Sequence, residues 1–329
     1  MHPANRSCTF TSALAPYFAQ HIAEKRVLGC RYTSVETALR ELDRYLLNQG
    51  VTHPDFTREF LDTWIARRPN ESPGTQASRF TVVRQFCLFL ERQGHAPYIP
   101  TGHLLAKRRQ TFVPYIFSTD EIGHLFAVLD QTRSHPRAPQ RAVIVPLVFR
   151  LLYGCGLRIS EALHLRVCDV DVTRGLLAIR ETKFLKDRLV PVAPSVATRL
   201  QQYYTTHRTQ SHDDAWFFPA PDGGEWSPQV FYDLFRHALR QCGISHGGRS
   251  RGPRLHDLRH TFACHRLAQW LRAGVAIDLA LPILSTYLGH ESMYRTQRYL
   301  HLFPQLYPDI TAKLTAYCGT VIPSLEVTP

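Results

Sequence analysis

The chain has 329 residues, of which 44% are hydrophobic, so it carries enough apolar side chains for a folded core and global disorder is excluded. Its formal net charge of +12 at pH 7 favours a polyanionic partner, with nucleic acid before a membrane surface. We recognise neither a secretion signal nor an uninterrupted apolar run of the roughly 18 residues that a spanning helix needs. The eight cysteines form no C-x-x-C pair, so we expect a cytoplasmic protein with reduced thiols and no zinc cage.

The N-terminal third is expected to be helical. Segments 34–50, 54–68 and 75–94 carry apolar residues at helical spacing, and the first and last of them end at glycine. Residues 95–116 then break the pattern with three prolines, which predicts an interdomain linker. Its basic triplet, Lys107-Arg108-Arg109, fits either a solvated tether or a segment that crosses a phosphate backbone.

The pattern changes beyond residue 115. Residues 175–192 alternate between apolar and polar side chains and predict a β-hairpin with its tip near 183–187. The fold expected from these patterns is mainly α-helical with a small β-sheet or hairpin, in two domains. Helices are expected at 118–130, 142–157, 158–172, 194–206, 228–242 and 256–273.

Several basic or proton-carrying side chains stand in distinctive settings. Arg158 in "YGCGLRISEALHL" opens a helix, near the positive end of its dipole, and Glu161 lies one turn on, where it can hold the guanidinium. Lys183 lies at the predicted hairpin tip, and His256 and Arg259 share one helix face at positions i and i+3.

The stretch "LGHESMYRTQRYLHL" adds His290 and two tyrosines, Tyr294 and Tyr299. Together these motifs resemble those of the tyrosine recombinase (phage integrase) family: a G-L-R-x-S-E-hydrophobic box, a hairpin lysine, H-x-x-R, L-G-H, and a tyrosine nine residues after that histidine. All five occur in the family order, over about residues 115–305. Tyr299 has the family spacing from His290 and Tyr294 does not.

The resemblance implies a set of catalytic roles. Tyr299 would be the nucleophile, because a phenolate can keep the energy of the broken DNA bond in a covalent phosphotyrosine. Arg158 and Arg259 would clamp the phosphate oxygens, which guanidinium groups do bidentately, so that no metal or cofactor is required. Lys183 would protonate the leaving 5′-oxygen, and His256 and His290 would serve in acid–base and phosphate-binding roles. Glu161 and His260 would support these groups.

Some alternatives stay open. The predicted hairpin tip lacks the glycine that the family often has there, so Lys186 is a second candidate for the catalytic lysine. His256, His260 and Cys264 fall on one helical stripe, but H-x-x-x-H without an acidic partner is a poor zinc site. Thirty residues separate Arg259 from His290, and this long spacing between the two motifs resembles that of transposon-borne recombinases.

Basic residues are the expected DNA contacts, because Lys and Arg side chains bind phosphate groups. The tail beyond Pro308 is expected to pack either on its own domain or on a neighbouring protomer. The candidate DNA contacts are Arg79, Arg84, Lys107, Arg108, Arg109, Arg249, Arg251 and Arg254.

The family resemblance implies four parts: a helical, SAM-like core-binding domain (1–100), a basic linker (101–115), a catalytic domain (116–307) and a tail (308–329). It implies a recombinase that acts on double-stranded DNA as a tetramer on two sites, through a Holliday junction, near the nucleoid and with accessory recombination proteins. A type IB topoisomerase-like enzyme and a non-catalytic DNA-binding protein are the rival readings.

Overall fold

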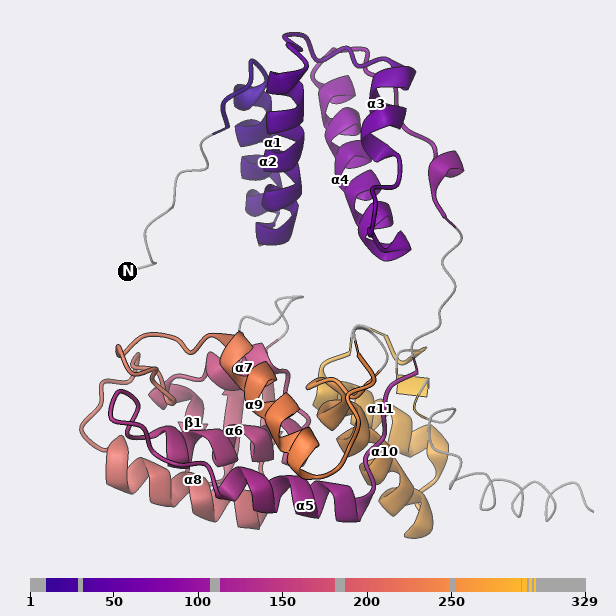
Figure 1. Ribbon diagram of the computed structural model, residues 1–329. Coiled ribbons are helices and arrows are strands. Elements are labelled where there is room, and N and C mark those ends of the chain that lie inside the picture. Colours follow the sequence, from indigo (N-terminus) through magenta and orange to yellow (C-terminus); the bar gives the residue numbers. More distant parts are fainter. Residues whose placement is uncertain are drawn as a thin grey trace, which may run out of the picture. The chain divides into compact units, whose positions relative to one another are not determined.

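The computed structural model describes residues 10–28, 32–106, 113–180, 187–248, 252–290, 292–294, 296–297 and 299. It divides into an N-terminal unit, Met1–Thr111, and a C-terminal unit, Phe112–Pro329 (Figure 1). The division falls inside the segment expected to be a linker. None of the helices in the described part of the chain is long and apolar enough to cross a membrane.

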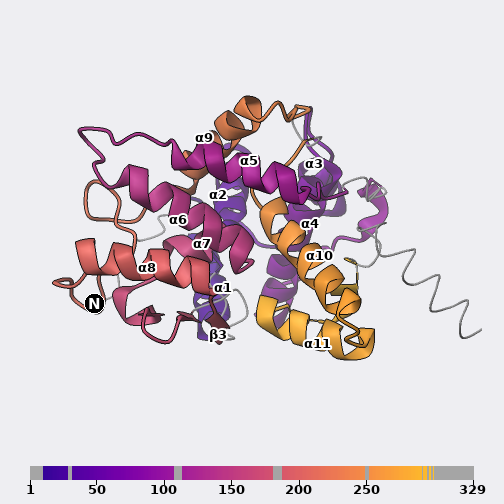
Figure 2. The same cartoon turned by 90° about the horizontal axis from the view of Figure 1, so that it is seen from below.

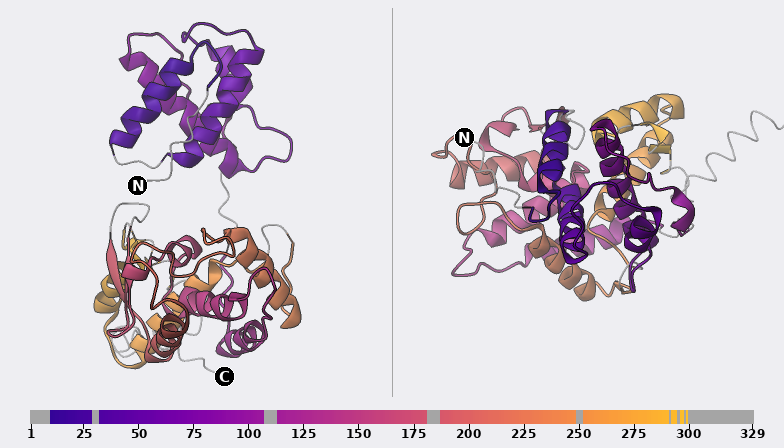
Figure 3. Two further views of the ribbon diagram at one scale, coloured as in Figure 1. Left: turned by 90° about the vertical axis from the view of Figure 1, so that its left-hand side faces the viewer. Right: turned by 90° about the horizontal axis from the view of Figure 1, so that it is seen from above.

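The N-terminal unit is a helical bundle built around α4, which packs against the other three long helices (Figure 3). Side-chain caps begin two of them, because Thr57 accepts a hydrogen bond from the backbone N–H of Phe60, and Ser72 accepts one from that of Thr75. The described helices of this unit are α1 (Ala15–Val27), α2 (Thr33–Asn48), α3 (Arg58–Ile65), α4 (Pro73–Arg92) and the short 3₁₀-helix η1 (Gly102–Leu104).

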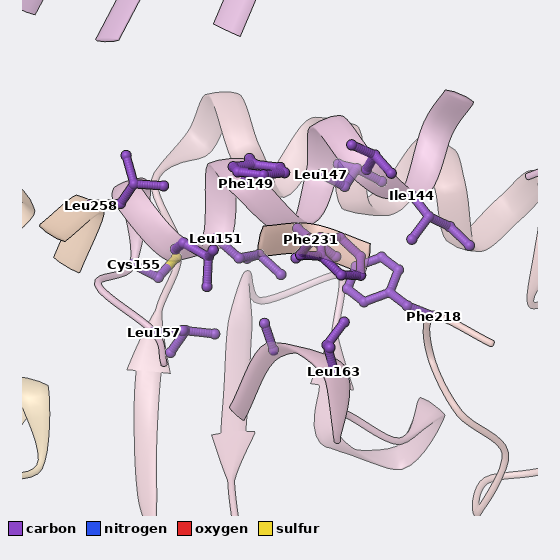
Figure 4. Packing of buried hydrophobic residues seen from close by; sticks show 14 of the residues in the cluster. Ile144, Leu147, Phe149, Leu151, Cys155, Leu157, Leu163, Phe218, Phe231 and Leu258 are labelled. Carbon is purple, nitrogen blue, oxygen red and sulfur yellow. The ribbon is translucent and has the colours of Figure 1, made fainter. Parts of the chain in front are cut away.

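The C-terminal unit is organised around α6, whose apolar residues face neighbours on several sides, as expected for a helix in a core. It packs against α5, α7, α8 and α10. Figure 4 shows side chains of α6, such as Leu151, in one buried cluster with Leu163, Phe231 and Leu258 from other elements. The described helices are α5 (Thr119–Asp130), α6 (Arg141–Gly154), α7 (Ile159–Leu163), η2 (Val167–Asp169), α8 (Pro194–His207), α9 (Pro228–Gln241), α10 (Asp257–Arg272) and α11 (Ile277–Leu288).

A three-stranded antiparallel sheet completes this unit, with the order β1 (Val170–Asp171), β2 (Leu176–Ile179) and β3 (Arg188–Pro191). The predicted hairpin is therefore present. Its register pairs Ile179 with Arg188, and its predicted tip lies largely in residues 181–186, outside the described residues. The mainly α-helical fold with a small sheet is confirmed.

Two expectations about elements need correction. The helix expected over 158–172 ends at Leu163, and the chain then forms η2 and β1. Val170 pairs with Leu177 of β2 and is buried there, a placement that suits β-branched valine better than a helix does. The second difference is α11, which was not predicted and which contains Pro282. It lies beside α10 (Figure 2), and Leu281, Leu284 and Leu288 are buried at helical spacing along it.

Candidate active site

The turn between α6 and α7 presents Arg158. Gly156 takes a φ of 60°, and a Cβ there would lie 2.6 Å from the Phe262 ring, so glycine is needed for both conformation and space. Arg158 is the N-cap of α7; its backbone N–H donates to Glu161 Oε2 (2.9 Å) and its Nη1 to Glu161 Oε1 (2.5 Å). The pairing expected from the sequence is present, and the arginine side chain stays 29% exposed, so it can still meet a ligand.

Arg259 lies at the centre of the site and is only 1% exposed. Its Nη1 donates to the carbonyl of Gly156 (2.6 Å) and its Nη2 to the carbonyl of Leu288 (2.5 Å). One guanidinium thereby joins the H-x-x-R helix, the arginine turn and the end of α11. Burial lowers the pKa of Arg259 to about 10, helped by the charge of Arg158, so the group remains a cation at neutral pH.

Glu161 is enclosed by three arginines, since Arg158, Arg188 and Arg259 all approach its carboxylate. Burial opposes its ionisation, but the hydrogen bonds and charge of Arg188 and the charge of Arg259 outweigh it and lower the pKa of Glu161 to about 2. Arg188 was not among the predicted site residues. The signal that could have found it is a charged residue at the first position of an otherwise apolar strand.

His256 is the N-cap of α10 and lies at the surface beside the two arginines. Desolvation by the surrounding protein and the charges of Arg259 and Arg158 lower its pKa to about 4, so the imidazole is neutral at pH 7. Its ring meets the His260 ring edge-on, with centroids 4.7 Å apart. A neutral imidazole here can donate a hydrogen bond to a phosphate oxygen or accept one from a hydroxyl group.

The structure separates the two tyrosines clearly. Tyr299 is 3% exposed, whereas Tyr294 is 76% exposed. A hydrogen bond joins the Tyr299 hydroxyl to His260 Nδ1 (3.1 Å), and the His290 ring stacks on the Tyr299 ring at 6.0 Å between centroids. His290 Nδ1 also bonds to Thr296 Oγ1 (2.8 Å). His260 was expected only to support the site, yet it contacts the phenol directly.

The phenol and the guanidinium cluster belong to one site. An ionised Tyr299 would raise the pKa of Arg259, so the two groups lie within electrostatic reach. Cys264 also contacts this tyrosine, with its Sγ 4.0 Å from the backbone carbonyl oxygen. The stripe His256, His260 and Cys264, considered above as metal ligands, is therefore occupied in part by contacts to Tyr299.

Several predicted residues lie outside the described part of the chain: Lys183, Lys186, Lys107, Arg108, Arg109, Arg249 and Arg251. Arg254 is described; it is exposed two residues before His256, and its backbone N–H donates to Asp257 Oδ2 (2.9 Å). Its exposed side chain stays a predicted DNA contact.

Arg79 has a different role from the one predicted. It is 4% exposed, pairs with Glu71 through Nε (2.7 Å) and Nη2 (2.9 Å), and donates to the carbonyls of Trp64 and Ala66. Since this guanidinium is enclosed and hydrogen-bonded within the N-terminal unit, the structure contradicts its prediction as a DNA contact. Arg84, on the same helix, is half-buried and stays a prediction.

Comparisons with known proteins agree with this arrangement. Residues 117–305 match the model of the phage integrase family. The chain is 33% identical to a putative integrase/recombinase, y4rB, of Sinorhizobium fredii over 93% of its own length and 97% of the relative's. It is 30% identical to the tyrosine recombinase XerD of Brucella abortus, over 87% and 90% of the two chains.

Two solved structures share the fold. The integrase of transposon Tn1549, in complex with circular intermediate DNA, aligns with a TM-score of 0.60 at 16% identity, over 88% of this chain and 95% of that one. The XerH recombinase, bound to palindromic difH in a post-cleavage complex, aligns with a TM-score of 0.60 at 17% identity, over 84% and 77%. On the family match and the relatives' identities, the chain belongs to the phage integrase family and is an enzyme of the tyrosine recombinase class.

Proposed function

We propose that this enzyme breaks and rejoins double-stranded DNA at specific sites through a covalent 3′-phosphotyrosine on Tyr299, and that paired exchanges pass through a Holliday junction. The observation that carries the proposal is the buried Tyr299 hydroxyl, hydrogen-bonded to His260 and within electrostatic reach of Arg259. Of the two tyrosines in this segment, Tyr294 is exposed and Tyr299 is the one held against catalytic side chains.

The chemistry follows from these positions. The Tyr299 oxygen attacks the phosphorus, the bond from phosphorus to the 5′-oxygen breaks, and the phenol proton passes to a neighbouring imidazole, for which His260 is nearest. Negative charge that gathers on the non-bridging oxygens is met by Arg158 and Arg259. Lys183 supplies the proton to the leaving 5′-oxygen, and a DNA hydroxyl later attacks the phosphotyrosine to reverse the link.

The proposed partner is duplex DNA, with four protomers acting on two sites. Support comes from the net charge of +12 and from the relatives, named as recombinases and an integrase. We further propose that residues 1–100 and 116–307 both contact the DNA, joined by the linker 101–115, and that residues 308–329 contact either their own domain or a neighbour. The spacing between Arg259 and His290 supports a role in integration, excision or transposition of a mobile element.

The test begins by finding the site. Purified enzyme is incubated with sheared DNA from the organism that encodes it, and protein-linked fragments are recovered and sequenced. A duplex with the recovered sequence is then nicked just past the cleavage point, so that the freed strand diffuses away and the adduct accumulates. We expect a covalent adduct, in the presence of a metal chelator, from the wild type and Tyr294→Phe and none from Tyr299→Phe.

Other results would redirect the proposal. Binding without an adduct in any variant would leave a non-catalytic DNA-binding protein. An adduct accompanied by relaxation of supercoiled plasmid, but by no recombinant junction between two sites, would indicate a topoisomerase-like enzyme. Loss of the adduct in Tyr294→Phe instead of Tyr299→Phe would overturn the assignment of the nucleophile.

A further inference from the structure

We propose that Arg188 is a positioning residue for strand cleavage: it neutralises and orients Glu161 so that the charges of Arg158 and Arg259 remain available to the scissile phosphate. This inference rests on the proposed function, because it concerns the same site. It concerns a residue that touches neither the phenol nor, by this account, the DNA.

Arg188 contacts both Glu161 and the end of α11. It is the first residue of β3, opposite Ile179, and its side chain is 8% exposed. Its Nη1 and Nη2 meet the two oxygens of Glu161 at 3.2 and 2.9 Å, and its Nε donates to the carbonyl of Tyr287 at 3.0 Å. This planar, two-pronged contact is specific to arginine.

Gly289 shows how closely Arg188 passes the L-G-H segment. A Cβ at Gly289 would lie 3.1 Å from Arg188 Nη1 and 3.2 Å from its Cδ, and Gly289 ends α11 with a φ of 65°. Glycine satisfies both demands. Arg188 thereby connects three sequence motifs: the strand that leaves the hairpin of Lys183, the carboxylate of the arginine box, and the turn that precedes His290.

The charge balance of the cluster explains why the contact between Arg188 and Glu161 matters for cleavage. The cluster holds three guanidinium groups and one carboxylate, a net of two positive charges. Without Arg188, only Arg158 and Arg259 would balance the carboxylate. The net positive charge available to the phosphate would then be half as large. Because a buried carboxylate pairs with whichever cation is nearest, Glu161 would then hold the two catalytic arginines more tightly.

The experiment measures cleavage and binding separately, on the nicked duplex recovered above, for wild type, Arg188→Met, Arg188→Lys and Glu161→Gln. The single-turnover rate of adduct formation is taken at saturating enzyme, and the Kd is taken from titration of the same duplex. Arg150→Met is the matched control, because Arg150 also grips a carboxylate with both nitrogens, at 2.7 Å each to Asp130, away from the site.

We expect Arg188→Met to lower the cleavage rate roughly 10- to 100-fold, the range seen when outer partners that orient metal ligands are removed, with little change in Kd. Arg188→Lys keeps the charge but loses the two-pronged contact, so its rate should fall between those of Arg188→Met and the wild type. Arg150→Met should cleave like the wild type. These results together would separate a role in positioning from one in general stability.

A double variant makes the test decisive. Because Arg188 is argued to act through Glu161, adding Arg188→Met to Glu161→Gln should slow cleavage far less than it slows the wild type. The double variant also removes both charges of a buried pair, so it should fold even if Arg188→Met alone is too unstable to test. Losses that multiply independently, equal losses in Arg150→Met, or unchanged cleavage in Arg188→Met would each overturn the inference. A wild type that forms no adduct would overturn the proposed function instead.

Discussion

Glu161 gives the sharpest quantitative prediction, because it needs no DNA. The pKa of this carboxyl falls from 4.5 to about 2 despite its burial, owing to hydrogen bonds from Arg188 and the charges of Arg188 and Arg259. A folded-state pKa below the unfolded one stabilises the folded protein above the unfolded pKa, and that contribution is lost as pH falls towards the folded pKa. The lowering corresponds to about 3 kcal/mol, at 1.36 kcal/mol for each pKa unit.

The perturbation is Glu161→Gln, which cannot ionise and leaves three arginines without their shared carboxylate. We expect it to lower the free energy of unfolding by about 3 kcal/mol at pH 7, in line with the loss of one partner of a buried ion pair. The difference from the wild type should shrink as pH falls from about 4.5 towards 2, because wild-type Glu161 then becomes protonated as well.

Urea unfolding at a series of pH values, followed by tryptophan fluorescence and far-UV circular dichroism, measures this difference. Taking wild type minus variant cancels the other groups that titrate in acid and do not interact with Glu161. His256 is an exception, because the charge of Glu161 contributes to its pKa. If the difference in the free energy of unfolding stays constant between pH 6 and pH 2.5, this prediction is wrong, because ionisation of Glu161 then does not stabilise the folded protein.

Three further predictions concern single positions. His260→Ala should slow adduct formation roughly 100- to 10,000-fold with unchanged DNA binding, because the Tyr299 hydroxyl loses its imidazole partner; His260→Ala cleavage at the wild-type rate would contradict this. Gly289→Ala should lower the unfolding midpoint more than Gly243→Ala does, since both have a positive φ but only at Gly289 would the Cβ meet a guanidinium, and thermal unfolding of the two variants measures the difference. His21 is fully buried, and its pKa is lowered to about 4 by burial and by nearby Lys25. The N-terminal unit should therefore lose stability as pH falls from about 6.5 to 4. Hydrogen exchange of this unit measures that loss, and His21→Phe should abolish its dependence on pH.

Much of the fold could be read from local sequence. The helix expected over 118–130 is present as α5, which begins with a capping box between Ser118 and Glu121, a signal that involves residues within one turn. The hairpin was predicted from alternation over a few residues, and β2 and β3 pair as expected. The end of α7 was misjudged, because Val170 is drawn into a strand by its partner Leu177, and that pairing is not visible in a helical count.

The five motifs and their order identify the family without coordinates, and their spacing alone sets Tyr299 apart from Tyr294. Which groups contact one another is known only from the folded chain. Arg259 bonds to a carbonyl 103 residues away, and Arg188 bonds to a carboxylate 27 residues away. The structure also shows Arg79, which was predicted to contact DNA, in a buried ion pair with Glu71. The physical reason is that residue type and local periodicity report the chain's immediate neighbours, whereas burial, pKa and hydrogen-bond partners depend on distant segments brought together by packing.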